Sequence, residues 1–325
     1  MIELWRGGML ESLHMGHAVV CDGSGTVVEA WGDADALAYP RSSCKMLQAL
    51  SLIESGAADA AGLTERQLSL ACASHIGAAL HTGMVTDWLA GLGLGESDLR
   101  CGSHWPDDIA ARDLLVKTDA SPCQLHNNCS GKHAGFLTLN RHLNGGPDYV
   151  EVDHPVQRAV RAAFEDVTGM DSPGYGIDGC SAPNFATTVS AMARAMAFFA
   201  SANPDGSLRE RAAVRLHRAM ATFPEMVAGE GEACTDLMRA MGGKVAVKGG
   251  AEGYYVAIIP EKRLGVALKI VDGATRARQA AITAVLVRLG VLDVGHPVVA
   301  RYLTGPLTNC RGKVTGEMRL SAGFA

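Results

Sequence analysis

Two strand-hairpin patterns near opposite ends of the chain most constrain its fold. Residues 17–21 and 26–31 are short β-branched runs separated by Asp-Gly-Ser-Gly at 22–25, a composition typical of a tight turn. A second pair of apolar runs covers residues 254–260 and 264–271. We expect strands from both ends to join one antiparallel sheet, with the segment between them forming a second lobe.

The long segment between the hairpins is predominantly helical. Apolar periodicity with polar caps predicts helices over 42–56, 64–73, 76–92, 108–117, 133–142, 155–168, 186–202 and 208–221. The tail adds a short strand over 244–248 and a closing helix over 275–289. The predicted fold class is α+β: an antiparallel sheet flanked by helices, plus a helical lobe. We expect one catalytic domain over residues 1–325, with a sheet lobe from about 1–40 and 240–325 and a helical lobe from about 60–235.

Charge and hydropathy argue against several classes of partner. The 325 residues are 48% hydrophobic and 19% charged, and the net charge of −5 is not concentrated in blocks, so we expect no nucleic-acid partner. No run approaches the roughly 18 apolar residues that span a bilayer, and residues 1–6 lack a secretory-leader pattern. We therefore expect no membrane contact and a cytoplasmic location, where most of the 9 cysteines would be buried thiols rather than disulfides.

A Ser-x-x-Lys sequence begins the predicted 42–56 helix. Residues three apart on a helix share one face, so the Ser42 hydroxyl and the Lys45 amine can meet, and a neutral lysine can then accept the serine proton. The alternative is an ordinary helix cap at Ser42 with a solvated Lys45. The order of the predicted helices and strands favours the interpretation of Ser42 and Lys45 as a catalytic pair. Serine β-lactamases and penicillin-binding proteins also place a second lysine on a late strand, where this chain has Lys248-Gly249-Gly250.

A second serine stands among small residues. Positions 71–77 read Ala-Cys-Ala-Ser-His-Ile-Gly, and small neighbours let a ligand approach the backbone near Ser74. The alternative is a helix C-terminus capped by His75.

The most polar stretch of the helical segment is His-Asn-Asn-Cys-Ser-Gly-Lys-His at residues 126–133, and residues 176–183 bring another cysteine beside an aspartate. Thiolates and carboxylates suit zinc, which usually takes four tetrahedral ligands. The candidate ligands are Cys129, Asp178 and Cys180, with a nitrogen of Lys132 or His133 as the fourth. The spacing matches no common zinc-finger pattern, and buried thiols are the alternative.

Together these stretches resemble the zinc-containing L-asparaginases of the Rhizobium etli type, the L-asparaginase II family. The resemblance covers nearly the whole chain and rests on residues 41–46, 72–75, 126–133, 178–180 and 248–253. It implies a serine β-lactamase- and glutaminase-like fold, a homodimer, and hydrolysis of L-asparagine to L-aspartate and ammonia. It also implies one Zn²⁺ held by Cys129, Lys132, Asp178 and Cys180.

The resemblance assigns roles to single residues as well. Two serine–lysine pairs, Ser42 with Lys45 and Ser74 with Lys248, would carry acyl transfer. We expect Ser42 to be the nucleophile and Lys45 its general base, with Ser74 as the other candidate nucleophile. Backbone N–H groups near Ser42 and on the strand at Gly250 would form an oxyanion hole. The expected substrate contacts are Arg41, His133, Gly249 and Gly250.

Three other functions remain open at this point. A serine-dependent glutaminase of the same fold differs in its relative turnover of asparagine and glutamine. A penicillin-interactive hydrolase would need a Ser-x-Asn sequence, which we do not find suitably placed. A non-enzymatic, zinc-dependent binding protein would release no ammonia from asparagine.

Overall fold

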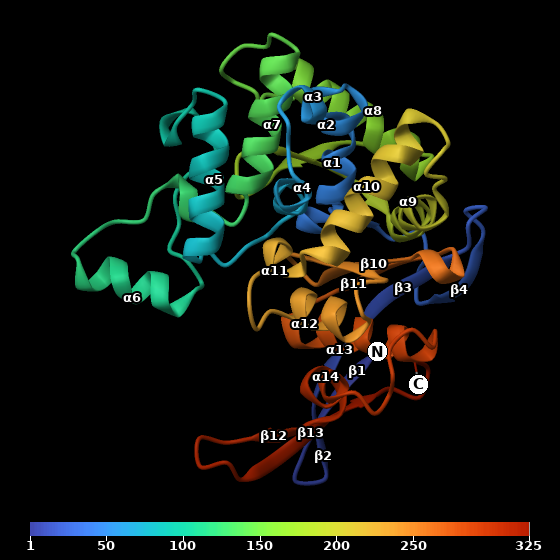
Figure 1. The fold of residues 1–325 in the computed structure, drawn as a ribbon. Coiled ribbons are helices and arrows are strands. Elements are labelled where there is room, and N and C mark those ends of the chain that lie inside the picture. Colours follow the sequence, from blue (N-terminus) through green and yellow to red (C-terminus); the bar gives the residue numbers. More distant parts are fainter. Residues whose placement is uncertain (325) are drawn as a thin grey trace. The chain divides into compact units, whose positions relative to one another are not determined.

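The computed structural model describes residues 1–324 and divides into two compact units. The sheet unit comprises residues 1–43, 187–201 and those from 236 onward, and the helical unit comprises residues 44–186 and 202–235. Figure 1 labels the helices and strands of both units.

A five-stranded antiparallel sheet in the order β4-β3-β11-β10-β9 forms the core of the sheet unit. Its strands are β3 (Gly16–Cys21), β4 (Val27–Trp31), β9 (Ala246–Gly250), β10 (Tyr254–Ile259) and β11 (Leu264–Ile270). β3 pairs with β11, with Val19 opposite Ala267. The predicted joining of strands from both chain ends in one antiparallel sheet is therefore confirmed.

Two helices cover this sheet. α9 (Val189–Ser201) packs against β3, β10 and β11, and α13 (Thr275–Arg288) packs against β10 and β11. Figure 1 shows α9 on one side of the sheet and α13 on the other. A Cβ atom at Gly265 of β11 would overlap the α9 backbone at Ala193 and Ala197. The close approach of this helix thus requires glycine on the strand.

A second, four-stranded sheet in the sheet unit was not predicted. Its order is β12-β13-β1-β2, and its strands are β1 (Ile2–Arg6), β2 (Met9–His14), β12 (Pro306–Thr308) and β13 (Val314–Leu320). In β1 only Ile2 and Leu4 are buried, and no residue of β13 is. Because the alternation of buried and exposed positions is short or absent, the hydrophobic pattern that marks a strand is weak here. The smaller elements of the unit are β5 (Leu37–Ala38), β8 (Thr187–Thr188), α14 (Pro297–Val299) and the helical turns Pro260–Lys262 and Ala300–Thr304.

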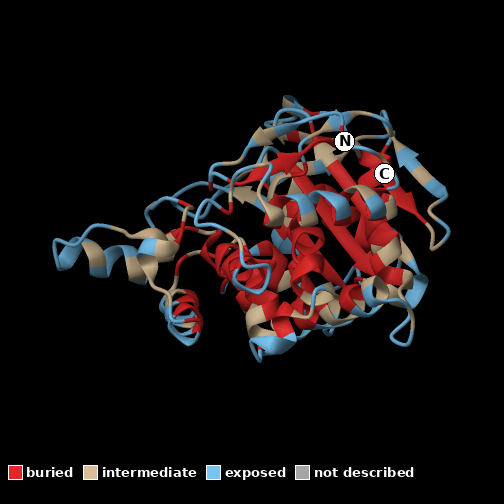
Figure 2. Cartoon of the chain, turned by 90° about the horizontal axis from the view of Figure 1, so that it is seen from above, coloured by how far each residue is buried: buried red, intermediate tan, exposed pale blue. Residues whose placement is uncertain are grey.

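The helical unit is built around α7 (Ser130–His142), in which residues 130–140 are all buried. The helices in contact with it are α2 (Leu50–Glu54), α3 (Ala57–Ala60), α4 (Glu65–Ala71), α5 (Ala79–Gly91) and α8 (Pro155–Thr168). The remaining elements are α1 (Lys45–Gln48), α6 (Ile109–Lys117), β6 (Tyr175–Ile177), β7 (Pro183–Phe185), α10 (Leu208–Thr222), α11 (Pro224–Val227), the turns Glu96–Asp98 and Gln124–His126, and α12 (Ala233–Ala240), where the chain passes between the units. Figure 2 shows buried residues concentrated in the central helices and strands.

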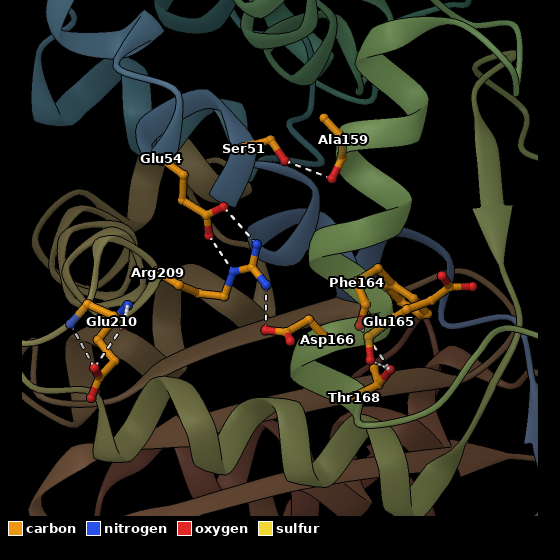
Figure 3. A network of polar contacts seen from close by, with 10 residues as sticks. Ser51, Glu54, Ala159, Phe164, Glu165, Asp166, Thr168, Arg209 and Glu210 are labelled. Carbon is orange, nitrogen blue, oxygen red and sulfur yellow. Dashed lines mark hydrogen bonds and ion pairs between the residues drawn. The ribbon is translucent and has the colours of Figure 1, made fainter.

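An ion-pair network joins three helices of the helical unit (Figure 3). Arg209 of α10 donates to Glu54 of α2 through Nε at 2.7 Å and Nη2 at 2.9 Å, and its Nη1 contacts Asp166 of α8. Such a two-point arginine–carboxylate contact fixes orientation as well as charge.

The predicted continuous helix over residues 42–56 is wrong. Arg41–Cys44 forms a 3₁₀ turn, and the following α-helix is interrupted at Ala49 between α1 and α2. Arg41 has a φ of 52°, which no α-helical residue adopts. The amide and hydroxyl of Ser43 both donate to Pro40 O, at 3.1 and 2.6 Å, and this i→i+3 bond tightens the turn. Ser42 therefore lies within a 3₁₀ turn rather than at a helix N-cap.

The other predicted helices are present, with three shifted starts. The helix predicted from residue 133 begins earlier, at Ser130. The helix predicted from residue 76 begins at Ala79, because Gly77 has a φ of 73° and Ala78 is extended. The helix predicted from residue 186 begins at Val189, after the short strand β8.

Candidate active site

Lys45 and Ser74 meet in the helical unit. Lys45 is 1% exposed, and its Nζ donates to Ser74 Oγ at 3.0 Å and also to the carbonyl of Ala73. The sequence interpretation paired Ser42 with Lys45 and Ser74 with Lys248. The structure instead brings Lys45 to Ser74, 29 positions away along the chain.

The segment carrying Ser74 is a link without regular secondary structure between α4 and α5. The Ser74 amide donates to Val227 O at 2.9 Å, and the Ile76 amide donates to Ala228 O at 2.9 Å. The intervening amide of His75 donates in the other direction, to Asn128 O at 3.2 Å. These bonds hold Ser74 between the 227–228 loop and the loop that begins α7.

The remaining serine–lysine candidates lie in the sheet unit. Lys248 of β9 is 1% exposed, and its Nζ donates to Gly249 O at 2.7 Å. A Cβ at Gly250 would stand 2.6 Å from Pro40 O and 2.9 Å from Ser43 N. The end of β9 therefore packs directly on the turn that carries Arg41 and Ser42, both half-buried. The structure thus brings these predicted substrate-binding and catalytic residues of the sheet unit together.

Two cysteines and a lysine converge at the start of α7. Cys129 directly precedes the helix, and Lys132 lies in its first turn. Cys180 comes from the β6–β7 hairpin turn, where Asp178 N donates to Ala182 O at 2.9 Å and Ser181 has a φ of 70°. Lys132 Nζ donates to Cys180 Sγ at 2.9 Å. The Cys129 thiol is within hydrogen-bond distance of Asn128 Oδ1, at 3.0 Å, and of Cys180.

Charge separation explains how this cluster is stable when buried. The hydrogen bond from Cys129 lowers the pKa of Cys180 well below that of an ordinary thiol, against the effect of burial and with help from Lys132. The same hydrogen bond and burial raise the pKa of Cys129 to about 12. Burial works against the Lys132 charge, but the two thiols and Asp178 outweigh it and raise the pKa of that lysine. Without a metal ion, these shifts favour a thiolate at Cys180 paired with a protonated Lys132.

The donor set at this cluster fits a soft divalent metal. Two sulfurs and an amine nitrogen already stand together, and thiolates favour zinc over harder cations. Asp178 Oδ1 accepts the Gly179 amide at 2.8 Å. Among residues 1–324, no three His, Cys, Asp or Glu side chains form a group that could hold a metal ion. The fit therefore rests on the cysteine–cysteine–lysine cluster, with Asp178 close enough to influence its charges.

His133, predicted both as a substrate contact and as a possible metal ligand, is fully buried. Its Nδ1 lies 2.8 Å from Tyr149 Oη, and its ring packs edge-on against Phe136 and Tyr149. Of the two nitrogen ligands left open by the sequence, the structure brings Lys132, not His133, to Cys180.

His75 was interpreted as a possible helix cap, which is wrong because α4 ends at Ala71. It is instead buried and bonded to Ser130, the first residue of α7, at 2.9 Å. Sequence reasoning missed Ser130 altogether. Its place beside Cys129 was the available signal, but no spacing rule connects positions 75 and 130.

Within the described residues, none of the helices combines the length and apolar character needed to cross a bilayer.

Comparisons with solved structures support the fold. Mglu in its Tris and glutamate form is 12% identical, with 86% of this chain and 60% of the Mglu chain covered and a TM-score of 0.50. Another Mglu structure has the same identity and TM-score, with 86% and 68% covered. A β-lactamase from Mycobacterium bovis is 14% identical, with 85% and 95% covered and a TM-score of 0.46. At such identities the Mglu likeness shows the fold alone, and it confirms the predicted fold class.

The sequence comparison gives the family. No curated protein matches the chain significantly. A family profile described as L-asparaginase II matches residues 2–320, nearly the whole chain. The predicted resemblance is thereby confirmed, and this chain belongs to the L-asparaginase II family of amidohydrolases.

Proposed function

We propose that the protein hydrolyses L-asparagine to L-aspartate and ammonia by acyl transfer through a serine. The family supports the substrate, and the observation that carries the chemistry is the 3.0 Å contact between Lys45 Nζ and Ser74 Oγ. A buried lysine beside a serine hydroxyl is a known arrangement for activating that hydroxyl, since the neutral amine can accept its proton.

In this proposal, the serine oxygen attacks the side-chain amide carbon of asparagine. The serine proton passes to the lysine and then to the leaving nitrogen, which departs as ammonia. Water then hydrolyses the resulting ester, releasing aspartate and restoring the serine. The sequence predicts Ser42 as the nucleophile, and the Lys45 contact makes Ser74 the competing assignment.

We also propose that Cys129, Lys132, Asp178 and Cys180 hold a zinc ion, supported by the convergence of the two sulfurs with the lysine. Bound there, zinc would supply a fixed positive charge for orienting an anionic or carbonyl group of the substrate. A homodimer and a cytoplasmic location are further proposals that rest on the family resemblance and composition. Sedimentation and cell fractionation test them.

The direct test is ammonia release from L-asparagine, with L-glutamine assayed in parallel. We expect asparagine to be the better substrate. Faster release from glutamine would replace the proposal with a glutaminase, and trapping of a labelled penicillin would point to the penicillin-interactive alternative. If neither amide releases ammonia, the remaining candidate function is that of a zinc-dependent binding protein.

Two serine variants then assign the nucleophile. Loss of the nucleophile should lower kcat at least about 1,000-fold, as in other serine hydrolases. If Ser42→Ala has this effect and leaves no acyl-enzyme detectable by mass spectrometry, Ser42 is the nucleophile. If Ser74→Ala does so instead, while Ser42→Ala still forms the acyl-enzyme, the role belongs to Ser74.

A further inference from the structure

Both ring nitrogens of His75 are used, and their partners fix its tautomer. The Gly77 amide donates to Nδ1 at 3.1 Å, so Nδ1 carries no proton. Nε2 must then carry the proton and donate it to Ser130 Oγ at 2.9 Å. Ser130 Oγ in turn donates to Leu125 O at 3.0 Å. The three bonds form a directed chain in which every polar hydrogen has one acceptor.

This chain connects two parts of the helical unit that carry different chemistry. His75 directly follows Ser74, whose hydroxyl contacts Lys45. Ser130 directly follows Cys129 and begins α7. The His75 amide adds a second connection, to Asn128 O at 3.2 Å. The side chain and the backbone of one residue thus tie the serine segment to the loop of the thiol cluster.

Burial makes the connection rigid. His75 is 1% exposed and Ser130 is fully buried, so loss of the bond leaves a buried polar group unsatisfied. The His75 ring stacks on His81 of α5, with centroids 4.8 Å apart and planes inclined by 10°. The ring thus packs on His81 through its face and is hydrogen-bonded to Gly77 and Ser130 at its edge.

We propose that His75 is a positioning residue. Its bond to Ser130 holds Ser74 against Lys45 and fixes the position of this pair relative to the loop before α7. The inference rests on the proposed function of Ser74 and Lys45. The hydrogen bonds of the His75 ring go to Gly77 and Ser130, not to Ser74 or Lys45. Its effect on the reaction comes through the placement of Ser74, where a shift of about 1 Å can cost on the order of 100-fold in rate.

A matched pair of variants separates the two ring nitrogens. In His75→Asn, the amide oxygen can replace the Nδ1 acceptor, but nothing reaches Ser130. In His75→Gln, the terminal amide can replace the Nε2 donor to Ser130. We expect His75→Asn to lower kcat for asparagine about 100-fold with KM nearly unchanged, and His75→Gln to restore most of it. Rates are expressed per folded chain, with the folded fraction measured by urea unfolding, so that misfolded protein does not contribute.

Ser130→Ala and His81→Gln complete the design. Ser130→Ala removes the bond to His75 and the bond to Leu125 O, and it should also lower kcat. The double variant His75→Asn/Ser130→Ala should be no slower than the slower of the two single variants, because both remove the His75–Ser130 bond. His81→Gln keeps the donor to Glu225 O and alters the same ring stack, so it should leave kcat within about threefold of the wild type. If His75→Asn does not fold, Ser130→Ala carries the test alone.

Three results would overturn the proposal: wild-type kcat in folded His75→Asn or Ser130→Ala, a loss in His81→Gln equal to that in His75→Asn, or no rescue by His75→Gln. Each presupposes an active wild type. A wild-type chain that releases no ammonia would instead defeat the proposed function, and the two failures are therefore distinguishable.

Discussion

The two units bury different kinds of side chain. In the sheet unit, all six residues of β10, Tyr254–Ile259, are buried, and none is ionised at neutral pH. In the helical unit, α7 buries Lys132 and His133 beside two thiols, and Lys45 is buried close by. Exceptions in the sheet unit are Lys248, at the end of the sheet that packs on the Ser42 turn, and His14, whose Nδ1 lies 2.6 Å from Asp272 Oδ2.

This difference separates what holds the protein together from what performs chemistry. Burying apolar side chains stabilises a fold in proportion to the area removed from water. Burying an ammonium or thiolate costs several kcal/mol per ion unless partners compensate for it. Buried ionisable groups therefore lower the free energy of unfolding of the unit that contains them. Replacing such a group should affect activity more than folding.

The largest expected effect tests the ionisable interior. Lys45→Met keeps the length of the side chain but removes the amine that contacts Ser74. We expect kcat to fall about 1,000-fold or more, because general-base catalysis contributes up to about 10,000-fold. The free energy of unfolding should fall by at most about 3 kcal/mol, since the carbonyl of Ala73 loses its lysine donor. Ammonia release and urea unfolding measure the two.

The control is Lys117→Met at the exposed end of α6, which should change neither quantity. A Lys45→Met chain with more than about a tenth of wild-type kcat would break the comparison, because general-base catalysis contributes at least about 100-fold. The buried lysine would then be structural.

The next effect tests the apolar interior. Ile258→Ala in β10 removes fully buried methyl groups and should lower the free energy of unfolding by about 2–5 kcal/mol. The kcat of the folded fraction should not change. Val294→Ala, 70% exposed in the same unit, serves as the control and should stay within about 0.5 kcal/mol of the wild type. A large loss of kcat in folded Ile258→Ala would show that the units are not separable in this way.

A pair of buried cysteines compares the units directly. Cys180→Ser should weaken zinc binding at least about 100-fold. Removing a residue that only hydrogen-bonds to a metal ligand usually lowers metal affinity by up to about 100-fold, and loss of a ligand itself should cost more. Cys21→Ser removes a thiol that is equally buried in β3 of the sheet unit and donates to Ser190 O. It should leave zinc affinity unchanged. Equilibrium titration with a competing chelator measures both, and equal affinities in the two variants would return Cys180 to the class of ordinary buried thiols.

The smallest effect concerns acid. Burial, with the neighbouring His81, lowers the pKa of His75 well below 6.5, and burial also lowers the pKa of His81. Each ring therefore gains its proton at a lower pH in the folded chain than in the unfolded one. Stability should therefore decline as the pH falls below 6.5, by up to about 1.4 kcal/mol per pH unit for each ring.

Urea unfolding from pH 7.5 to 5.5 measures this slope. His81→Gln should make it shallower. Ile258→Ala, which removes no titrating group, should shift the unfolding free energy equally at every pH. A slope in His81→Gln as steep as in the wild type would assign the acid sensitivity to other groups.

Local patterns were sufficient for the main elements. The apolar runs in β3, β10 and β11 and the helices around Pro155–Thr168 and Leu208–Thr222 were predicted close to their observed bounds, because period and capping act over a few residues. The failures were also local. The 3₁₀ turn at Arg41–Cys44 depends on a positive φ that no letter pattern marks, and β13 lacks the alternation that a strand prediction requires.

The sequence by itself determined the fold class, the joining of strands from both chain ends in one sheet, and the polar stretches that carry chemistry. The pattern that predicts each of these lies in neighbouring residues. Only the tertiary structure decided which distant groups meet: Lys45 with Ser74, Lys132 with Cys180, and His75 with Ser130. These partners are separated by 29, 48 and 55 positions. Their distances follow from how whole helices pack around α7, and helix packing is a sum of many contacts that no single motif encodes.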